Sequence, residues 1–380
     1  MNKILLSAFL LFFDCHPSSA QEQSKKNQPA SSNPLITQSD KDIDGVVRQY
    51  LKSQKTVGLE IGILKDNKTL YYGYGETERG NRQLPDEHTI FEIGSITKTF
   101  TATLLAKAIV DGKMKLDDPV SKYLPDSLPV LEYRGMPATL QTIANHTSGI
   151  PGNPSNIKYP PEIKGVWSGD PFKDYDDNDL FSFYAHFKLK RKPGEKFEYS
   201  NLAFGTLGVM LERIYGKSFE QLVGEKISGP LGMVDTRQTV PPGDTPRVAH
   251  GYANNGQPAP AWHAKALAGC GALRSTASDL LRYAQAEIGQ GPLQLTAAIA
   301  LTQQATYRQK KFGLGLAWVI IRLDRTMGVL HGGTTGGFGS LLILIPNKKA
   351  ALVILANNPL GVDDLAGDIL SVMKKDEKLL

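Results

Sequence analysis

Short apolar strands are predicted at both ends of this 380-residue chain, and this pattern constrains its fold more than any other feature. Near the start, segments 57–64 and 69–74 flank the turn sequence Lys-Asp-Asn-Lys, which predicts an antiparallel hairpin. Near the end, four more strands are predicted, at residues 315–323, 328–331, 340–345 and 350–356. We therefore expect both ends of the chain to build one antiparallel sheet.

The middle of the chain has helical rather than strand-like patterns. Apolar residues recur at helical spacing in four segments, at residues 102–110, 140–144, 180–187 and 202–215. Ser218 and Gln221 have the spacing of a capping box that opens another helix, and a closing helix is predicted at 362–373. The predicted fold is therefore α/β (α+β), with a central antiparallel sheet flanked by helices and an inserted, mostly helical lobe.

The chain is longer than the size at which a single core usually stops growing, so we expect one large domain or two closely packed lobes. The folded domain is predicted at residues 40–375. Its sheet lobe would cover about 40–100 plus 265–375, and its helical lobe about 101–264. Residues 21–39 are polar and rich in proline and serine, which predicts a flexible tether.

The first 20 residues have the pattern of an export signal peptide. Lys3 precedes an apolar run at residues 4–13, and the small residues at 18–20 form a cleavage site. The apolar run is too short to span a membrane as a helix, so no stable membrane span is expected. Cleavage near Ala20 would leave a periplasmic or secreted protein with Cys270 as its only cysteine and no intrachain disulfide.

Composition and missing motifs exclude several classes of function. The net charge of +5 comes from 43 basic and 38 acidic residues without a basic block, so no nucleic-acid partner is expected. The seven histidines are scattered, and neither H-E-x-x-H nor paired Cys/His spacing is present. Walker A and Rossmann glycine motifs are absent as well. We therefore expect neither a metal nor a cofactor, and we expect a monomer.

Ser95 and Lys98 place a hydroxyl and an amine one helical turn apart, which is the arrangement of a serine nucleophile with a built-in base. The same spacing recurs at Ser155, which lies among prolines, and at Ser371, in the last predicted helix. Only Ser95 follows a strand-like segment and precedes an apolar helical pattern. It would lie at a helix N-terminus, where free N–H groups and the helix dipole favour an oxyanion. The alternative interpretation of Ser95 is a helix cap beside a solvated lysine.

A second candidate element is Tyr199-Ser-Asn201, in a short extended piece before a predicted helix. A tyrosine oxygen near the serine can pass a proton, and the asparagine amide can hold both the lysine and a substrate carbonyl. Tyr199 would otherwise be a core tyrosine with one hydrogen-bond partner. The similar sequence Tyr252-Ala-Asn254 is followed by a loop with no helix to fix its side chains, so we reject it.

A third candidate element is the glycine-rich segment from His331 to Ser340, between two late strands. Its glycines would let backbone lie against a substrate, and an exposed strand edge there would pair with a peptide-like ligand. The backbone N–H of Thr334 would join that of Ser95 in an oxyanion hole. The alternative is a plain hairpin loop, although tight hairpins need only about two residues.

These three elements, in this order, resemble the penicillin-recognising serine hydrolases, and most closely the class C β-lactamase branch. The resemblance covers nearly all of the chain after residue 20 and includes the segments 91–100, 115–119, 123–125, 146–151, 219–221 and 335–340. It implies that Ser95 is the acylated nucleophile, Lys98 its base partner and Tyr199 the proton shuttle. The residues that the resemblance implies in substrate binding are Asn153, Asn201, His331, Gly333, Thr334 and Thr335.

The chain departs from the β-lactamase pattern at the third motif. Those enzymes usually carry Lys-Thr-Gly, where this chain has His331-Gly332-Gly333, and a histidine would be only partly charged at neutral pH. A tyrosine of class C enzymes is replaced by Gly271. The resemblance implies a serine hydrolase acting on β-lactams through an acyl-enzyme. Alternatives are a D-Ala-D-Ala carboxypeptidase/endopeptidase or esterase, and a non-catalytic penicillin-binding sensor. The partner in each case is a small-molecule or peptide substrate.

Overall fold

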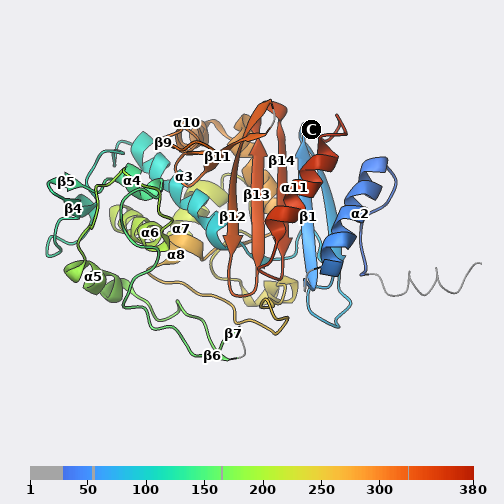
Figure 1. Cartoon of the computed structure of the whole chain (residues 1–380), viewed down its shortest axis with the longest axis horizontal. Helices are drawn as coiled ribbons and strands as arrows, with labels where there is room; N and C mark the ends of the chain where they lie inside the picture. The colour runs from blue at the N-terminus through green and yellow to red at the C-terminus, as the bar shows by residue number, and fades with distance from the viewer. Residues whose placement is uncertain (1–28, 54–55, 164–165, 324) are drawn as a thin grey trace, which may run out of the picture.

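A computed structural model describes residues 29–53, 56–163, 166–323 and 325–380. Its main element is an antiparallel sheet of eight strands, in the order β2-β1-β14-β13-β12-β11-β10-β9 (Figure 1). These strands are β1 (Gly58–Lys65), β2 (Lys68–Gly75), β9 (Tyr307–Arg308), β10 (Gly313–Leu314), β11 (Val319–Leu323), β12 (Thr326–Thr334), β13 (Gly339–Ile345) and β14 (Ala350–Ala356). The prediction that both ends of the chain build one antiparallel sheet is therefore confirmed.

The first strand of the chain pairs directly with the last. Leu59 of β1 lies opposite Ala356 of β14, and the pairing continues to Lys65 opposite Ala350. Along both strands almost every side chain is buried, because helices cover both faces of the sheet. The centre of the sheet is therefore built from segments almost 300 residues apart in the sequence.

Helices α2 (Gln38–Ser53) and α11 (Val362–Met373) cover one face of the sheet and contact each other (Figure 1). Their apolar side chains pack with alternate sheet residues such as Ile61 and Ile343, as the two-residue period of a strand requires. Leu342, the residue before Ile343, faces the opposite side of the sheet. There it belongs to the other hydrophobic core, which includes residues of helix α9 (Ala277–Gln285). The sheet therefore separates two hydrophobic cores.

The remaining helices build the lobe beside the sheet. They are α3 (Thr97–Val110), α4 (Leu140–Ala144), α5 (Asp177–His186), α6 (Asn201–Tyr215), α7 (Phe219–Val223), α8 (Ala268–Gly271) and α10 (Leu293–Thr302). The predicted capping box is present, since Gln221 N donates to Ser218 Oγ and Ser218 N donates to Gln221 Oε1. The described residues also form 3₁₀ turns at Gly94–Ile96, Val120–Tyr123, Pro242–Arg247 and Pro346–Lys348, and π-helical turns at Gly224–Ser228 and Ala286–Gln290.

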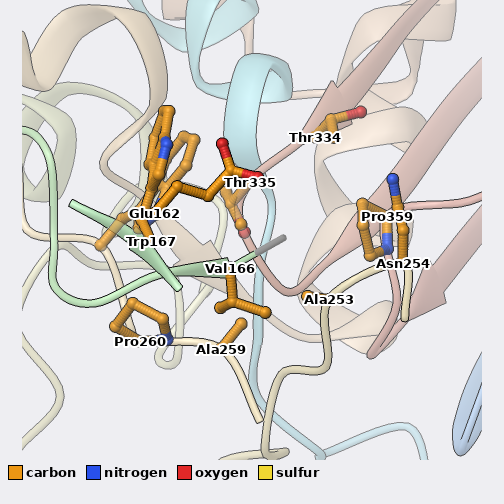
Figure 2. A pocket seen from close by; sticks show the side chains of 12 residues that line it. Glu162, Val166, Trp167, Ala253, Asn254, Ala259, Pro260, Thr334, Thr335 and Pro359 are labelled. Atoms are coloured by element: carbon orange, nitrogen blue, oxygen red, sulfur yellow. The ribbon is translucent and has the colours of Figure 1, made fainter. Parts of the chain in front are cut away.

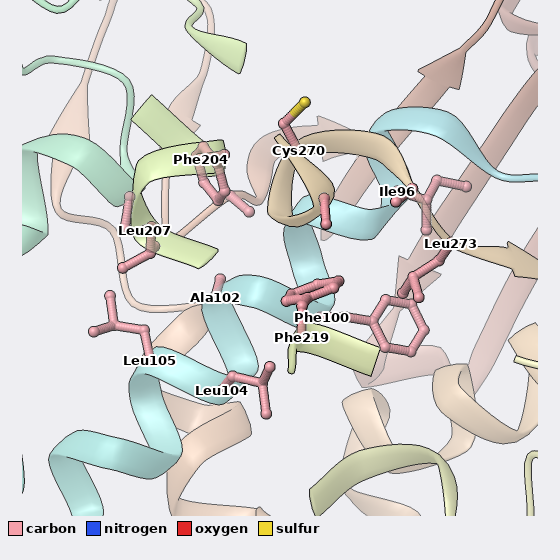
Figure 3. Packing of buried hydrophobic residues seen from close by; sticks show 14 of the residues in the cluster. Ile96, Phe100, Ala102, Leu104, Leu105, Phe204, Leu207, Phe219, Cys270 and Leu273 are labelled. Carbon is pink, nitrogen blue, oxygen red and sulfur yellow. The ribbon is translucent and has the colours of Figure 1, made fainter. Parts of the chain in front are cut away.

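Helix α3 lies at the centre of this lobe and is buried on nearly all sides. Phe100 and Leu104 pack among side chains of α6, α7 and the α8 region (Figure 3). Its buried threonines are hydrogen-bonded, for example Thr101 to the Gly269 carbonyl at 2.7 Å. Because α3 begins two residues after Ser95, this packing holds the candidate nucleophile in a rigid part of the protein.

Two sequence predictions need correction. Residues 315–323 do not form one strand, because Gly315–Trp318 make a tight turn that leaves only β11 after it. The predicted tether at 21–39 is ordered from residue 29 onward: Ser32 N donates to Gly73 O, and Asn33 donates to the Tyr74 hydroxyl. The predicted signal peptide and residues 21–28 lie outside the described residues.

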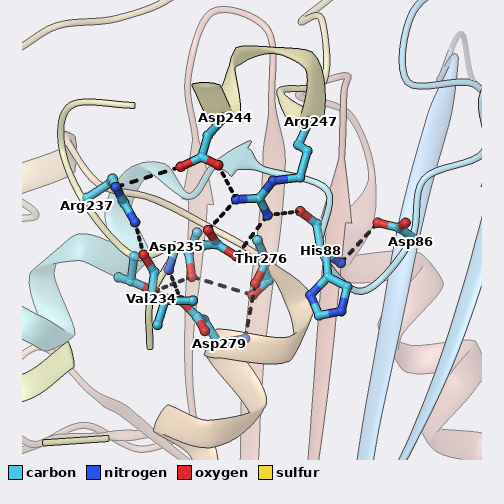
Figure 4. Close-up of polar contacts among 11 residues, drawn as sticks. Asp86, His88, Val234, Asp235, Arg237, Asp244, Arg247, Thr276 and Asp279 are labelled. Carbon is cyan, nitrogen blue, oxygen red and sulfur yellow. Dashed lines mark hydrogen bonds and ion pairs between the residues drawn. The ribbon is translucent and has the colours of Figure 1, made fainter. Parts of the chain in front are cut away.

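Three two-stranded sheets complete the described strands: β3 (Phe91–Glu92) with β8 (Arg274–Ser275), β4 (Glu132–Tyr133) with β5 (Met136–Pro137), and β6 (Glu162–Ile163) with β7 (Val166–Trp167). An ion-pair network anchors the approach to β3 (Figure 4). Arg247 pairs with Asp235 and Asp244 and donates to the His88 carbonyl at 3.0 Å. Its own carbonyl accepts from Ile90 N. Among the described helices, none has the length and apolar character needed to cross a bilayer.

Candidate active site

Ser95 lies in the 3₁₀ turn that joins strand β3 to helix α3. Gly94, just before it, has φ +46°, a conformation that side chains disfavour. A Cβ at Gly94 would come within 2.8 Å of the Thr334 backbone nitrogen. A glycine is therefore needed here for the serine turn to approach strand β12 closely.

The Lys98 ammonium group is fully buried and makes three hydrogen bonds. Its Nζ lies 2.9 Å from Ser95 Oγ, 2.8 Å from Asn201 Oδ1 and 2.7 Å from the Cys270 carbonyl oxygen. The last two acceptors have no proton to give, so each takes an N–H of the lysine. The remaining position on Nζ faces Ser95, where it holds either a third N–H or the lone pair of a neutral amine. The same geometry can therefore donate a proton to Ser95 or accept one from it.

Tyr199 and Asn201 are held by the N-terminus of helix α6. Ser200 between them caps the helix, its Oγ accepting from Ala203 N at 2.9 Å. The Tyr199 ring is partly exposed and lies over the lysine, with Lys98 Nζ 4.8 Å from the ring centre. Asn201 Nδ2 also donates to Asn153 Oδ1 at 3.1 Å. The structure therefore brings Asn153 into the same group as the three catalytic candidates.

Strand β12 forms the opposite wall of the site. Its pairing with β11 ends at Leu330 opposite Val319, while its pairing with β13 continues to Thr334. On the β11 side, residues 331–334 therefore extend beyond the paired region, beside the serine turn. This is the open strand edge that the sequence predicts, although it belongs to a long strand and not to a loop.

His331 is buried and neutral. Burial, together with the nearby Lys98 charge, lowers the pKa of His331 to about 3. Its Nδ1 lies 2.7 Å from the Gly332 carbonyl oxygen, which can only accept, so Nδ1 carries the proton and Nε2 the lone pair. The expectation of a partly charged histidine at neutral pH is therefore wrong, because a charged imidazole would be desolvated beside an ammonium group.

The two glycines after His331 have different surroundings. A Cβ at Gly333 would come within 2.1 Å of the Ile93 carbonyl oxygen and 2.9 Å of Ser95 N, so only glycine allows this approach. A Cβ at Gly332 would make only ordinary contacts, the nearest at 3.6 Å. Gly333 is not among the residues that line the pockets at Ser95, and the close approach gives it a packing role. Its contact with a substrate stays a prediction.

A pocket of about 410 Å³ lies between the two walls, and its lining residues are Ser95, Tyr199, Asn201, Val319, His331, Gly332 and Thr334. A smaller pocket on the other side of Ser95 includes Asn153 and Thr334 in its lining. Thr335 lines a third pocket, of about 310 Å³, opposite Glu162 and Trp167 (Figure 2). Thr334 lies where all three pockets meet, and Thr335 lies one step farther from the serine.

An aromatic group next to Ser95 was not predicted from the sequence. The Trp167 and Trp262 rings stack at 5.8 Å, and Tyr159 and Phe172 pack against them. All four line the smaller pocket together with Gly271. The Cys270 carbonyl that binds Lys98 was missed as well. No local motif signals either feature, because both depend on segments brought together by the fold.

The other Ser-x-x-Lys sequences lack these surroundings. Ser155 is exposed, and Ser371 is exposed on α11 with its hydroxyl bonded to the Gly367 carbonyl. Tyr252 is buried away from Ser95, and its hydroxyl accepts from Arg79 N. Among the three matches in the chain, only Ser95 has a buried lysine at hydrogen-bond distance and a polar pocket.

Comparisons with known proteins agree with this geometry. The sequence profile of the family described as Beta-lactamase matches residues 43–374. The chain is 31% identical over 337 residues to the D-alanyl-D-alanine-carboxypeptidase/endopeptidase AmpH of Escherichia coli (strain K12), covering 82% of this chain and 84% of that protein. It is 29% identical to a Beta-lactamase of Pseudomonas fluorescens, covering 83% and 92% of the two chains.

Solved structures show the same fold. A Beta-Lactamase/D-Alanine Carboxypeptidase from Pseudomonas syringae superposes with a TM-score of 0.78 at 23% identity, covering 88% of this chain and 99% of that one. A class C beta-lactamase has a TM-score of 0.78 at 24% identity, covering 90% and 98%. The fold is that of the β-lactamase/transpeptidase proteins, and the protein is a serine hydrolase of the β-lactamase type. The chain belongs to the Beta-lactamase family.

Proposed function

We propose that this protein hydrolyses β-lactams through an acyl-enzyme on Ser95. The observation that carries the proposal is the Lys98 ammonium group, buried and bonded to Ser95 Oγ, Asn201 Oδ1 and the Cys270 carbonyl. A buried lysine with no carboxylate among these partners is costly to keep, and here it directly faces a hydroxyl that opens on a pocket. Relatives named Beta-lactamase, which match over most of this chain, support the proposal.

In the proposed mechanism, Lys98 reacts as the neutral amine, with its lone pair facing Ser95 Oγ. Ser95 Oγ attacks the lactam carbonyl carbon as its proton passes to Lys98 Nζ, and the ammonium group so formed returns a proton through Tyr199. The backbone N–H groups of Ser95 and Thr334 stabilise the oxyanion, each contributing about 3–4 kcal/mol by analogy with measured oxyanion donors. The Tyr199 hydroxyl delivers a proton to the leaving nitrogen as the C–N bond breaks. Water then attacks the ester, and Ser95 regains its proton through the same groups.

Substrate contacts are proposed on both walls of the pocket. Asn201 and Asn153 would donate to the carbonyl of the acyl side chain, since their amide groups lie at 3.1 Å from each other beside Ser95. The unpaired side of β12 at Thr334 would bond a substrate amide as an added strand does. Thr335 would contact the part of a longer substrate that reaches the third pocket.

A second candidate function is a D-Ala-D-Ala peptidase or an esterase. The observation that favours it is the neutral His331 at the position where β-lactamases usually carry a lysine. The residues that line the three pockets, all in the described part of the chain, include no arginine or lysine. A substrate carboxylate would therefore meet no free positive charge there, which favours an esterase over a peptidase, because D-Ala-D-Ala ends in a carboxylate. The relative named D-alanyl-D-alanine-carboxypeptidase/endopeptidase AmpH supports this candidate.

Intact mass measurement with a penicillin separates these functions. A transient adduct with hydrolysed drug indicates a β-lactamase, and a lasting adduct indicates a peptidase or a non-catalytic sensor. Hydrolysis of an activated ester without an adduct indicates an esterase. Ser95→Ala should abolish the adduct, whereas Ser155→Ala should leave it unchanged because Ser155 is exposed outside the pocket. An adduct that persists in Ser95→Ala contradicts the proposal.

We also propose that the protein is exported and acts as a monomer. The predicted signal sequence at residues 1–20 supports export, although it lies outside the described residues. N-terminal sequencing of protein from the extracytoplasmic fraction should begin near residue 21, and sedimentation should give the mass of one chain. An unprocessed N-terminus in the cytoplasmic fraction would contradict export.

A further inference from the structure

His146 holds three consecutive residues of the segment that carries Tyr199. Its carbonyl oxygen accepts from Glu198 N at 2.8 Å, and its ring Nδ1 accepts from Ser200 N at 3.1 Å. Tyr199 lies between these two anchored residues. The segment is therefore bonded on both sides of the tyrosine to one residue of the neighbouring loop.

The His146 ring also forms a platform for the tyrosine ring itself. The two rings stack with centroids 4.4 Å apart and planes 28° apart. Phe204 lies 4.8 Å from the histidine on helix α6, and Phe197 meets it edge to face at 6.0 Å. With only 3% of His146 exposed, these neighbours prevent the platform from shifting.

His146 is fixed in one protonation state as well as in one orientation. The Ser200 N–H can only donate, so Nδ1 carries the lone pair and Nε2 carries the proton. Burial and the nearby Lys98 charge lower the pKa of His146 well below its usual range. The backbone of His146 has φ +59°, a conformation that is uncommon for a residue with a side chain. The ring that stacks on Tyr199 is therefore held in one tautomer and one orientation.

We infer that His146 is a positioning residue for Tyr199, which keeps the tyrosine ring over Lys98 and in the lining of the pocket at Ser95. The inference rests on the proposed function, because it assigns to His146 an effect on acylation. His146 is not among the residues that line the pockets at Ser95, so it acts through the tyrosine and not on the substrate. A mispositioned proton shuttle slows the chemical step while leaving substrate binding nearly unchanged.

A double-mutant cycle tests this inference on the full-length protein. His146→Asn keeps an acceptor for Ser200 N–H and tolerates a positive φ, but it removes the ring that supports Tyr199. With penicillin or an activated ester, we expect kcat to fall about 10- to 100-fold while KM changes less than about twofold. In the Tyr199→Phe background, the same replacement should cost less than about twofold, because the group that His146 positions is already gone.

Two controls separate positioning from loss of stability. His186→Asn removes an exposed histidine at the end of α5 and should leave kcat unchanged. Ile369→Val, on the buried face of α11, lowers stability at a distance from the site and should lower Tm without lowering kcat at 25 °C. If His146→Asn does not fold, His146→Gln replaces it in the cycle.

The outcomes distinguish this inference from the proposed function. Equal losses of kcat from His146→Asn in both backgrounds would overturn the inference, as would a rise in KM with an unchanged single-turnover rate of acylation. Wild-type protein that forms no acyl-enzyme and hydrolyses neither substrate would overturn the proposed function, and the inference with it.

Discussion

The two walls of the cleft differ in the kind of group they present to a substrate. The helical wall carries the side chains of Lys98, Tyr199 and Asn201, with the buried ammonium group at its centre. The strand wall presents backbone, two glycines and the neutral His331, and no charge. In the proposed function, the helical wall carries the groups that transfer protons, and the strand wall would supply an oxyanion donor and align the substrate. The walls meet at the serine turn, where a Cβ at Gly94 would come within 2.8 Å of the Thr334 nitrogen of β12.

The largest expected effect follows from removing the charge of the helical wall. Lys98→Met keeps the length of the side chain but loses all three hydrogen bonds of Nζ. We expect acylation to slow by about 10²–10⁴-fold, the range for loss of a general acid–base group. Stopped-flow measurement with a chromogenic cephalosporin checks this rate. If the acylation rate of Lys98→Met fell by less than about tenfold, Lys98 would not be the proton acceptor, and Tyr199 would have to accept the serine proton by itself.

Gly333→Ala tests whether the strand wall must touch the serine turn. The added Cβ would overlap the Ile93 carbonyl oxygen, so β12 would have to move away from Ser95. We expect a loss of about 2–4 kcal/mol in the free energy of unfolding, together with a large loss of kcat. Urea unfolding and steady-state kinetics measure the two effects.

Gly332→Ala is the matched control, because its Cβ makes only ordinary contacts. Its stability should change by less than about 1 kcal/mol. Equal effects of the two replacements would mean that the close approach at Gly333 is not required.

Acid stability tests the neutral histidine of the strand wall. The pKa of His331 is about 3 in the folded protein, against about 6.5 in an unfolded chain. Between these values the unfolded chain binds more protons, so His331 lowers stability as the pH falls from about 6.5 toward 3. His331→Gln removes this contribution, and we expect its stability to fall less steeply, by about 3 kcal/mol between pH 7 and pH 4.

Urea unfolding at several pH values checks this slope. His146, on the helical wall, has its pKa lowered in the same direction, so part of the acid sensitivity should remain in His331→Gln. An unchanged slope in the variant would mean that folding does not lower the pKa of His331.

The smallest expected effect is a change of substrate preference. His331→Lys gives the strand wall a cation, which the pockets at Ser95 lack among their lining residues. For a penicillin and its methyl ester, we expect the ratio of kcat/KM to shift toward the free carboxylate by about tenfold. His186→Lys, at an exposed helix end, is the charge control and should leave the ratio unchanged. A shift of equal size in both variants would indicate a general charge effect.

The parts of the fold that depend on local patterns could be predicted from the sequence. Helix α11 begins and ends at the predicted residues, and both ends of the chain meet in one sheet as expected. Strand pattern alone did not reveal the tight turn at Gly315–Trp318. Residues 29–37 are held by hydrogen bonds to β2, and composition alone does not show these bonds.

The same division holds within the site. The spacing of Ser95 and Lys98 is local, so the sequence shows it. The Cys270 carbonyl at Lys98 and the aromatic rings around Trp262 come from distant segments, and no spacing predicts them. The protonation of His331 depends on burial beside an ammonium group 233 positions away in the chain, a property of the folded protein only.

The pairing of the first strand with the last has a consequence for how the protein folds. A contact between Leu59 and Ala356 closes a very long loop, so forming it is entropically expensive and slow. During synthesis, Ser95 and Lys98 emerge long before β12, β13 and β14, which complete the sheet and the second wall of the cleft. A chain shortened before residue 326 would hold the nucleophile and its lysine but no strand beside them. Ser95 is therefore synthesised early, and we expect it to react with a substrate only after strands β12 to β14 have been synthesised and have folded beside it.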